Sequence, residues 1–215
     1  PSGFEGSAVI ASDQPILAVA NVQPAGADSL LSYNGVPTGA KAVLLPVIMR
    51  GYYGWNTDFW VQNEGDTLAN VTMTYYYYGD VYHVANDTIP TGASHVYRQE
   101  DMPLPSRFYG SVIVQADQPV AVVVEQWNST IANAAAYNGI ADAGSSFLAP
   151  RQQKNSDGWS SGMTIMNVGA AETTIDARFY ASDGDLVWTE TSMVQPGGHV
   201  VHYLPALAGI PDGFD

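Results

Sequence analysis

Two central β-strands are predicted by the stretch SVIVQADQPVAVVVE at residues 111–125. Ser111–Ala116 and Pro119–Glu125 are apolar on both faces, which is typical of strands that are covered on both sides. The Asp-Gln-Pro tripeptide between them has the composition of a turn. A second version of the stretch, SAVIASDQPILAVAN, occupies residues 7–21. The chain therefore contains this strand pair twice.

The remainder of the chain repeats in the same way. Pro1 and Pro105 begin similar heptapeptides, which sets a repeat step of 104 residues in a chain of 215. The same step relates Tyr33-Asn34-Gly35 to Tyr137-Asn138-Gly139, Trp55 to Trp159, and Asn63 to Asn167. After the tyrosine run the step becomes 106, since Pro90 matches Pro196, and the last five residues begin the heptapeptide a third time. A repeat of this length predicts two β-domain units.

Alternating side chains predict strands throughout. Val71, Met73, Tyr75 and Tyr77 would share one face, and Ile175, Ala177 and Phe179 in the second copy keep that face apolar. About seven strands per unit and no helix are expected. The predicted fold is all-β, with two tandem immunoglobulin-like β-sandwich units whose repeat phase is permuted.

The permuted phase leaves one strand pair separate from the unit that it matches. Residues 37–140 hold a complete set of strands, whereas residues 141–215 stop before their last pair. Residues 1–36 supply that pair at the other end of the chain. They could complete the second unit of the same chain or of the next molecule, or the sequence could be a window of a longer array.

Some completion is expected, because a sandwich without two central strands would expose apolar edges to water. Exchange between molecules or a longer array is favoured over completion within one chain, which would require a connection from Asn34 across the whole first unit. β-strand complementation with different donor and acceptor surfaces is head-to-tail and yields an open filament. The protein would then be its own partner. The predicted subunit-contact residues are Ser7, Val9, Ile10, Pro15, Ile16, Leu17 and Val19.

Composition argues against several other partners. Seven basic residues face 21 acidic ones, giving a net charge of −14, so nucleic acid and anionic membrane surfaces are not expected as partners. The chain has no cysteine, which excludes disulfides and thiolate chemistry. Its apolar runs are too short for a membrane-spanning helix. It begins with proline, and we expect any secretion signal to have been removed or to lie outside this sequence.

No motif predicts a catalytic, cofactor or metal site. The four histidines have no matching ligands in both units, and Asp183-Gly184-Asp185 lacks the acidic spacing of a calcium loop and equally suits a hairpin turn. Ser, His and Asp are present without a nucleophile motif, so an enzyme is not expected.

Surface aromatics and sequons suggest contacts of other kinds. Tyr76 and Tyr78 would point outward and could form a subunit contact, and the many aromatic residues leave sugar binding open. Three sequons begin at Asn70, Asn86 and Asn128, and each would place a glycan on the surface if the host glycosylates exported chains.

Several short motifs resemble repeats of large bacterial cell-surface proteins that are mostly uncharacterised. They are Leu45-Pro46-Val47-Ile48-Met49-Arg50, Gly54-Trp55-Asn56-Thr57, Val61-Gln62-Asn63 and the Gly-Ser…Asp-Gln-Pro strand pair. The resemblance implies an extracellular, repetitive β-sandwich protein and supplies no catalytic residues. The leading hypothesis is a structural subunit of an extracellular filament or surface stalk. The alternative is a carbohydrate-binding or adhesive module cut from a longer surface protein.

Overall fold

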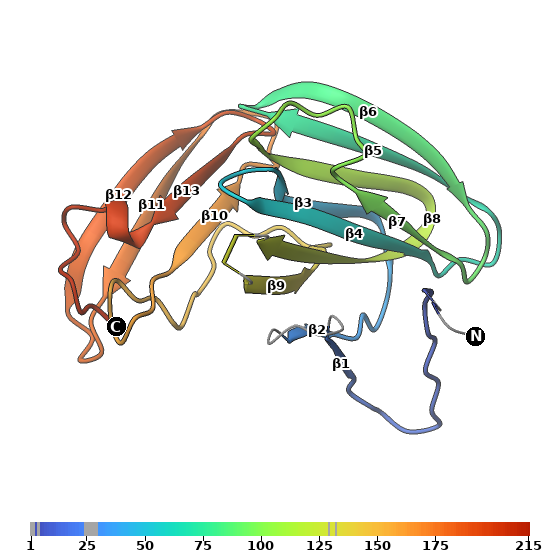
Figure 1. Ribbon diagram of the computed structural model, residues 1–215, viewed down its shortest axis with the longest axis horizontal. Helices are drawn as coiled ribbons and strands as arrows, with labels where there is room; N and C mark the ends of the chain where they lie inside the picture. The colour runs from blue at the N-terminus through green and yellow to red at the C-terminus, as the bar shows by residue number, and fades with distance from the viewer. Residues whose placement is uncertain (1–2, 4, 24–29, 129, 132) are drawn as a thin grey trace. The chain divides into compact units, whose positions relative to one another are not determined.

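The chain is all-β, as predicted, and its largest sheet curls as in a β-sandwich (Figure 1). The computed structural model describes residues 3, 5–23, 30–128, 130–131 and 133–215. Across these ranges no helix is long and apolar enough to cross a membrane. The chain divides into two compact units. Unit 1 contains the described residues up to Tyr77 and those from Val81 to Asp142, and unit 2 contains residues 78–80 and 143–215.

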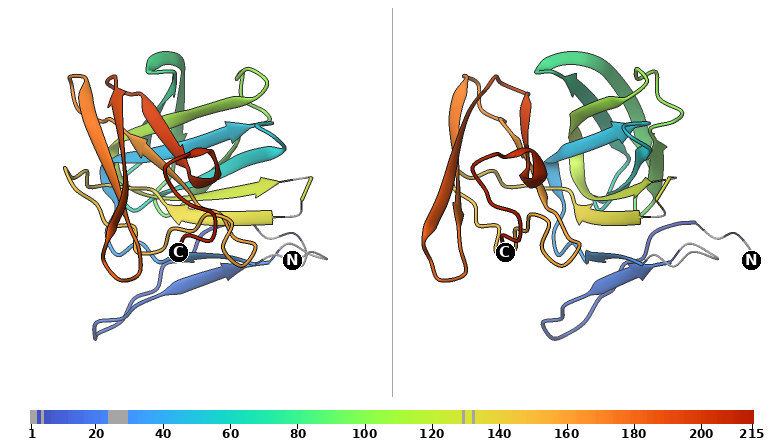
Figure 2. Two further views of the ribbon diagram at one scale, coloured as in Figure 1. Left: turned by 90° about the vertical axis from the view of Figure 1, so that its left-hand side faces the viewer. Right: turned by 60° about the vertical axis from the view of Figure 1, so that its left-hand side comes forward.

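Unit 1 is built on a seven-stranded sheet whose main order is β6-β5-β8-β4-β7. Two further strands, β3 and β9, also pair with β8. Figure 2 shows how strongly this sheet curls. Its strands are β3 (Ala40–Arg50), β4 (Trp55–Asn63), β5 (Ala69–Tyr77), β6 (Asp80–Ile89), β7 (Ser94–Arg98), β8 (Phe108–Asn128) and β9 (Asn133–Asn138).

The long strand β8 joins the whole sheet. Its first part pairs antiparallel with β3 and β5, and its second part pairs antiparallel with β4 and β9. The predicted turn at Asp117-Gln118-Pro119 is wrong, because β8 runs through these residues without a break. Pro119 lies between the last pair with β5, at Ala116, and the first pair with β4, at Val120, so its missing N–H interrupts neither ladder.

The core of unit 1 lies against the predicted inward face of β5. Val71, Met73 and Tyr75 are at most 1% exposed, and Tyr77 packs at the edge of the same cluster, so this prediction is confirmed. Val112, Val114, Val120 and Val124 of β8 are equally buried. Both halves of the SVIVQADQPVAVVVE stretch therefore supply the core.

Unit 2 consists of two separate two-stranded sheets. β10 (Gly162–Met166) pairs with β13 (His199–Tyr203), and β11 (Thr173–Tyr180) pairs with β12 (Leu186–Val194). A short 3-10 helix, η1 (Leu204–Ala206), follows β13. Five buried apolar residues of this unit form a small cluster: Ala177, Phe179, Leu204, Ile210 and Phe214. The inward positions predicted at Ala177 and Phe179 are confirmed.

The N-terminal residues form a small hairpin of their own. β1 (Val19–Val22) pairs antiparallel with β2 (Leu31–Asn34) in a two-stranded sheet. The predicted strand pair was expected to begin near Gly6, but the described residues between Glu5 and Ala18 contain no strand. A strand needs a partner to bond, and this stretch has no ladder to join.

Candidate functional site: an exposed N-terminal segment and an incomplete unit

The N-terminal segment, residues 5–36, carries the sequence of a core strand, but its large apolar side chains from Val9 to Val19 are exposed, while Leu31 further along is buried. Ile10 is 67% exposed and Ile16 is 49% exposed, whereas their counterparts Val114 and Val120 in β8 are 0% and 1% exposed. Val9, Leu17 and Val19 are also exposed. Of the predicted contact residues, Ser7 is half-buried and Pro15 is exposed. The segment thus presents the apolar pattern of β8 without a partner for it.

The end of this segment already has the geometry of its counterpart. Val19 lies opposite Asn34 in the β1–β2 hairpin, as Val123 lies opposite Asn138 in β8 and β9. The Gly35 N–H donates to the Ala18 carbonyl over 2.8 Å, and the Gly139 N–H donates to the Val122 carbonyl over 2.8 Å. The β1–β2 hairpin is therefore a preformed copy of the end of the β8–β9 pair.

Unit 2 lacks the strand that this segment resembles. By the repeat, β10 and β11 correspond to β4 and β5, and both of those strands pair with β8. Within the described part of unit 2, β10 pairs only with β13 and β11 only with β12. In the described part of the chain, one edge of β10 and one edge of β11, here called the open edges, thus have no neighbouring strand. Such edges invite pairing with another strand.

A second segment of unit 2 is expected to be a strand but is not one. Residues 144–153 correspond to β3, which in unit 1 pairs with β8, yet they form no strand. Every residue from 141 to 151 is exposed. Phe147 is 71% exposed, whereas its counterpart Val43 is 3% exposed. Without a β8 to bond, this segment leaves a large aromatic side chain in water.

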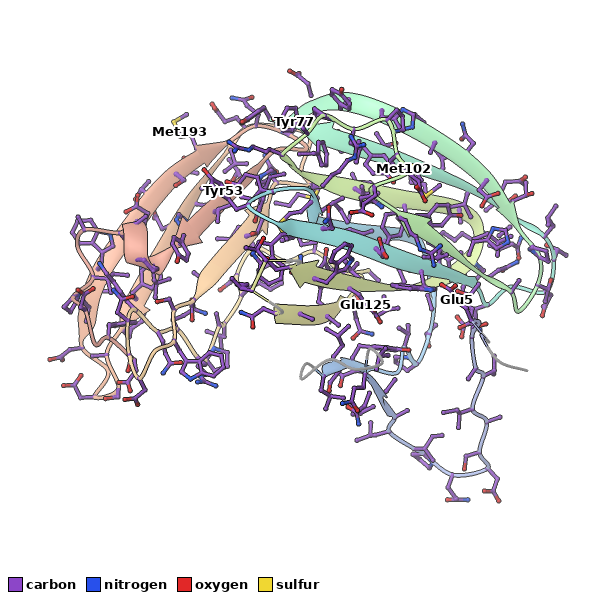
Figure 3. The ribbon with its side chains drawn as sticks, in the orientation of Figure 1. Glu5, Tyr53, Tyr77, Met102, Glu125 and Met193 are labelled. Carbon is purple, nitrogen blue, oxygen red and sulfur yellow. The ribbon has the colours of Figure 1, made fainter. Side chains whose placement is uncertain are left out.

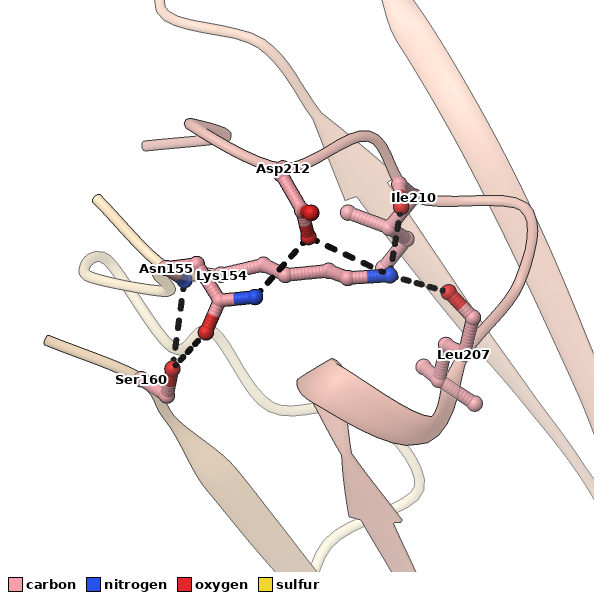
Figure 4. A network of polar contacts seen from close by, with 6 residues as sticks. All are labelled: Lys154, Asn155, Ser160, Leu207, Ile210 and Asp212. Atoms are coloured by element: carbon pink, nitrogen blue, oxygen red, sulfur yellow. Dashed lines mark hydrogen bonds and ion pairs between the residues drawn. The ribbon is translucent and has the colours of Figure 1, made fainter.

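The C-terminal residues occupy the place where the missing strand would begin. Lys154 and Phe214 form a β-bridge, and their counterparts Arg50 and Phe108 pair at the start of β8. The Lys154 ammonium donates to the carbonyls of Ile210 (2.8 Å) and Leu207 (3.0 Å) and lies 3.9 Å from an Asp212 carboxylate oxygen (Figure 4). Lys154 is 8% exposed, so these contacts satisfy a buried cation.

Asn155 extends this network to the neighbouring loop. Its side-chain amide donates to Asp212 over 2.9 Å, and its side-chain oxygen accepts from the Ser160 hydroxyl over 3.1 Å. The start position of the missing strand is thereby held in place although the strand itself is absent from the described residues. Sequence reasoning missed the role of Lys154. The available signal was its alignment with Arg50 at the 104-residue step.

In this structure the N-terminal segment contacts unit 1. The carboxylate of Glu5, which is labelled in Figure 3, accepts from Arg98 at 3.0 and 3.2 Å and from the Trp60 indole N–H at 3.3 Å. The Asn34 N–H donates to the Asn138 side-chain oxygen at 3.1 Å. These are polar, exposed contacts, and exposed ion pairs of this kind contribute little stability.

Carboxylates gather around the Glu5 contact. Asp58 and Glu125 lie directly opposite each other in β4 and β8. Burial raises the pKa of Asp58 to about 6, while nearby Arg98 acts in the opposite direction. Burial also raises the pKa of Glu125, and the charges of Asp58 and Glu5 add to that increase. Docking of Glu5 here therefore brings a third negative charge close to two that are already half-buried.

A hollow of about 300 Å³ lies beside the same contact on unit 1. Trp60, Asp87 and His95 line it together with Glu5 and Gly6 of the N-terminal segment. The Asp87 carboxylate lies 2.8 Å from the His95 ring nitrogen and accepts from the Tyr97 hydroxyl at 2.8 Å. Since the segment forms part of its wall, the hollow would change shape if the segment moved away.

The other predicted site residues are placed as follows. Tyr78 is 82% exposed at the β5–β6 turn, and Tyr76 is half-buried. Asn70 and Asn86 are exposed, and each has a side-chain hydrogen bond, to Asp117 and Thr72 respectively.

The expectation that Asn128 lies on the surface is wrong. Its side chain is 5% exposed, donates to the Tyr53 carbonyl and accepts from the N–H groups of Thr130 and Ile131. A side chain buried in this way does not present its amide nitrogen to solvent, as a glycan would require. Ser129 of this sequon lies outside the described residues.

The residues considered for metal binding are separated or paired in other ways. Asp183-Gly184-Asp185 forms the turn between β11 and β12, where the Asp185 N–H donates to the Asp183 carboxylate at 3.1 Å. His202 is 2% exposed, and burial lowers its pKa. Over the described ranges, no three His, Cys, Asp or Glu side chains gather as metal ligands would.

No protein-family model and no curated protein matches the chain. Among solved structures, it is similar to Thermotoga maritima 1070, with 19% identity, coverage of 50% of this chain and 98% of that chain, and a TM-score of 0.43. It is also similar to the Anabaena sensory rhodopsin transducer, with 20% identity, coverage of 41% and 97%, and a TM-score of 0.34. The resemblance to cell-surface repeats thus stays a prediction, and any functional argument depends on the geometry of this chain.

Proposed function

We propose that the protein is a structural subunit of an extracellular filament or surface stalk, in which residues 1 to about 36 of one copy complete unit 2 of the next. The observation that carries the proposal is the mismatch between Ile10 and Ile16 in water and their buried counterparts in β8. An apolar strand sequence exposed at one end of a chain fits an incomplete sheet at the other end. The job of such a subunit is mechanical.

The physical driving force has two parts. Main-chain groups on the open edges of β10 and β11 gain hydrogen bonds from an incoming strand, and its alternate apolar side chains leave water. Burying one aliphatic side chain contributes about 1.5–3 kcal/mol. The side chains of Ile10 and Ile16 would contribute together, minus the cost of ordering the segment.

The direction of assembly follows from the two surfaces. The N-terminal segment and the open edges are different parts of the molecule, so the contact is heterologous and propagates unless its rotation closes a ring. Contacts of the segment with Arg98 and Trp60 of unit 1 are exposed and polar, which supports a segment that can leave them. The extracellular setting of the proposal comes from the acidic composition and the resemblance to surface repeats.

Electron microscopy of the purified chain tests this function. The full chain is expected to form filaments, whereas a chain lacking residues 1–36 is not. A full-length variant with Ile10→Asp and Ile16→Asp serves as the matched control, because it keeps the length of the segment and replaces its two isoleucines with charged side chains. Compact single particles from the full chain would refute the filament and favour the sugar-binding module.

A further inference from the structure

We propose that the N-terminal segment occupies unit 2 of the next copy in one register, the register of β8 in unit 1, and that its arrival converts residues 144–153 into a strand. This inference depends on the proposed function and names the surface that performs it. It can fail while the filament stands, because a segment could pair with the open edges in another register.

The register follows from the pairs that β8 makes in unit 1. Ile113 lies opposite Thr74 of β5, and the 104-residue step places Val9 opposite Arg178 of β11. Val123 lies opposite Trp60 of β4, which places Val19 opposite Thr164 of β10. One segment thereby serves both open edges in turn, as β8 serves β5 and β4.

Residues of unit 2 define where the incoming strand begins and where it ends. Phe214 occupies the position of Phe108, so the C-terminal residues take up the place that Pro1–Glu5 would otherwise fill. The incoming strand therefore begins near Gly6. At its other end, Ile140 bridges Leu44 in unit 1, and the same step places Val36 opposite Leu148. Leu148 is 95% exposed and Val36 is 37% exposed before they meet.

A shift of register would lose this fit. A slip of one residue turns the buried face of the strand to solvent, because side chains alternate with a period of two. In the proposed register Ala8, Ile10, Ile16 and Ala18 take the places of four valines that are at most 2% exposed: Val112, Val114, Val120 and Val122. A slip of two residues would put Ser12 in the core position of Val114 and Ile16 in the position of Gln118.

The correspondence with unit 1 also predicts that residues 144–153 become a strand. Their counterpart β3 pairs with β8 from Arg50 to Ala40, whereas residues 144–153 form no strand and are exposed up to Arg151. An incoming strand would give residues 144–153 a neighbouring strand with which to form backbone hydrogen bonds. Phe147 would then take the place of Val43 against the incoming strand, which removes its ring from water.

Cross-linking between two single-cysteine chains tests the register, since the natural chain has no cysteine. Val9→Cys is mixed with Arg178→Cys and treated with a short bis-maleimide linker. Thr174→Cys replaces Arg178→Cys in the matched control, because it lies four residues away on the same face of β11, about 13 Å along the strand. A cross-linked dimer from the first mixture alone is the expected result. Each variant by itself should give none.

The other outcomes separate the two levels of the proposal. Filaments with no cross-link, or with a cross-link in the Thr174→Cys mixture, would overturn the register and leave the filament intact. Absence of filaments and of dimers from the unmodified chain would refute both. Hydrogen exchange supplies the second readout, because amides at residues 144–149 should become protected in filaments only. Unchanged exchange there would overturn the conversion into a strand.

Discussion

Ile10→Ala should weaken the contact between subunits without affecting the subunit itself. The Ile10 side chain is 67% exposed in the free chain, and its counterpart Val114 is 0% exposed. The substitution deletes three carbon atoms, or about 2.4 kcal/mol at about 0.8 kcal/mol each. Since only about two thirds of the side chain leaves water on assembly, about 1.6 kcal/mol of association free energy is lost, which is about 15-fold in affinity.

Sedimentation of filaments at a series of protein concentrations measures this change. For head-to-tail growth, the concentration of subunits left in solution reports the affinity of the contact, so it should rise about 15-fold for Ile10→Ala. The unfolding temperature of the free subunit should stay unchanged, because the side chain makes few contacts there.

Leu17→Ala is the matched control for this prediction. Leu17 is 101% exposed, and its counterpart in β8 is already an alanine, Ala121. The deletion should therefore change the soluble concentration by less than about twofold. An equal effect of both substitutions, or no effect of Ile10→Ala, would refute the assignment of Ile10 to a buried position.

The remaining predictions concern charge. Arg98→Ala removes the ion pair with Glu5 and should lower the soluble concentration in the same assay by up to about fivefold, the range of an exposed pair. Lys154→Ala leaves two carbonyls without their cation and should destabilise unit 2 by about 1–3 kcal/mol in urea, whereas exposed Lys41→Ala should not. Burial raises the pKa of Asp58 to about 6, so folded unit 1 binds the proton more tightly than the unfolded chain. Its unfolding temperature should therefore rise as pH falls from 7 to 5, and Asp58→Asn should reduce that rise.

The sequence was sufficient for the fold class and for the inward faces of the strands. Val71, Met73 and Tyr75 alternate with polar residues, and side-chain alternation is a local property of a strand. The likeness of residues 7–21 to residues 111–125 is also visible in the sequence alone. Neither conclusion required knowledge of which strands are neighbours.

The features that could not be predicted depend on partners. The residues near Ile10 have the sequence of a strand, but the ladder that would make them one is absent from the described chain. Asp117-Gln118-Pro119 has the composition of a turn, yet the four neighbours of β8 keep it extended. Burial of Asn128 and of Lys154 comes from loops that fold over them, which composition does not show.

Each contact between copies would complete one unit 2, so a linear assembly of any length would retain a single incomplete one at its terminal subunit. The open edges of β10 and β11 and the exposed Phe147 would persist there alone. The opposite terminal subunit would instead keep an undocked N-terminal segment, with Ile10 and Leu17 in water. The two ends of such an assembly would therefore differ in chemistry, and each could add a subunit only through its own surface.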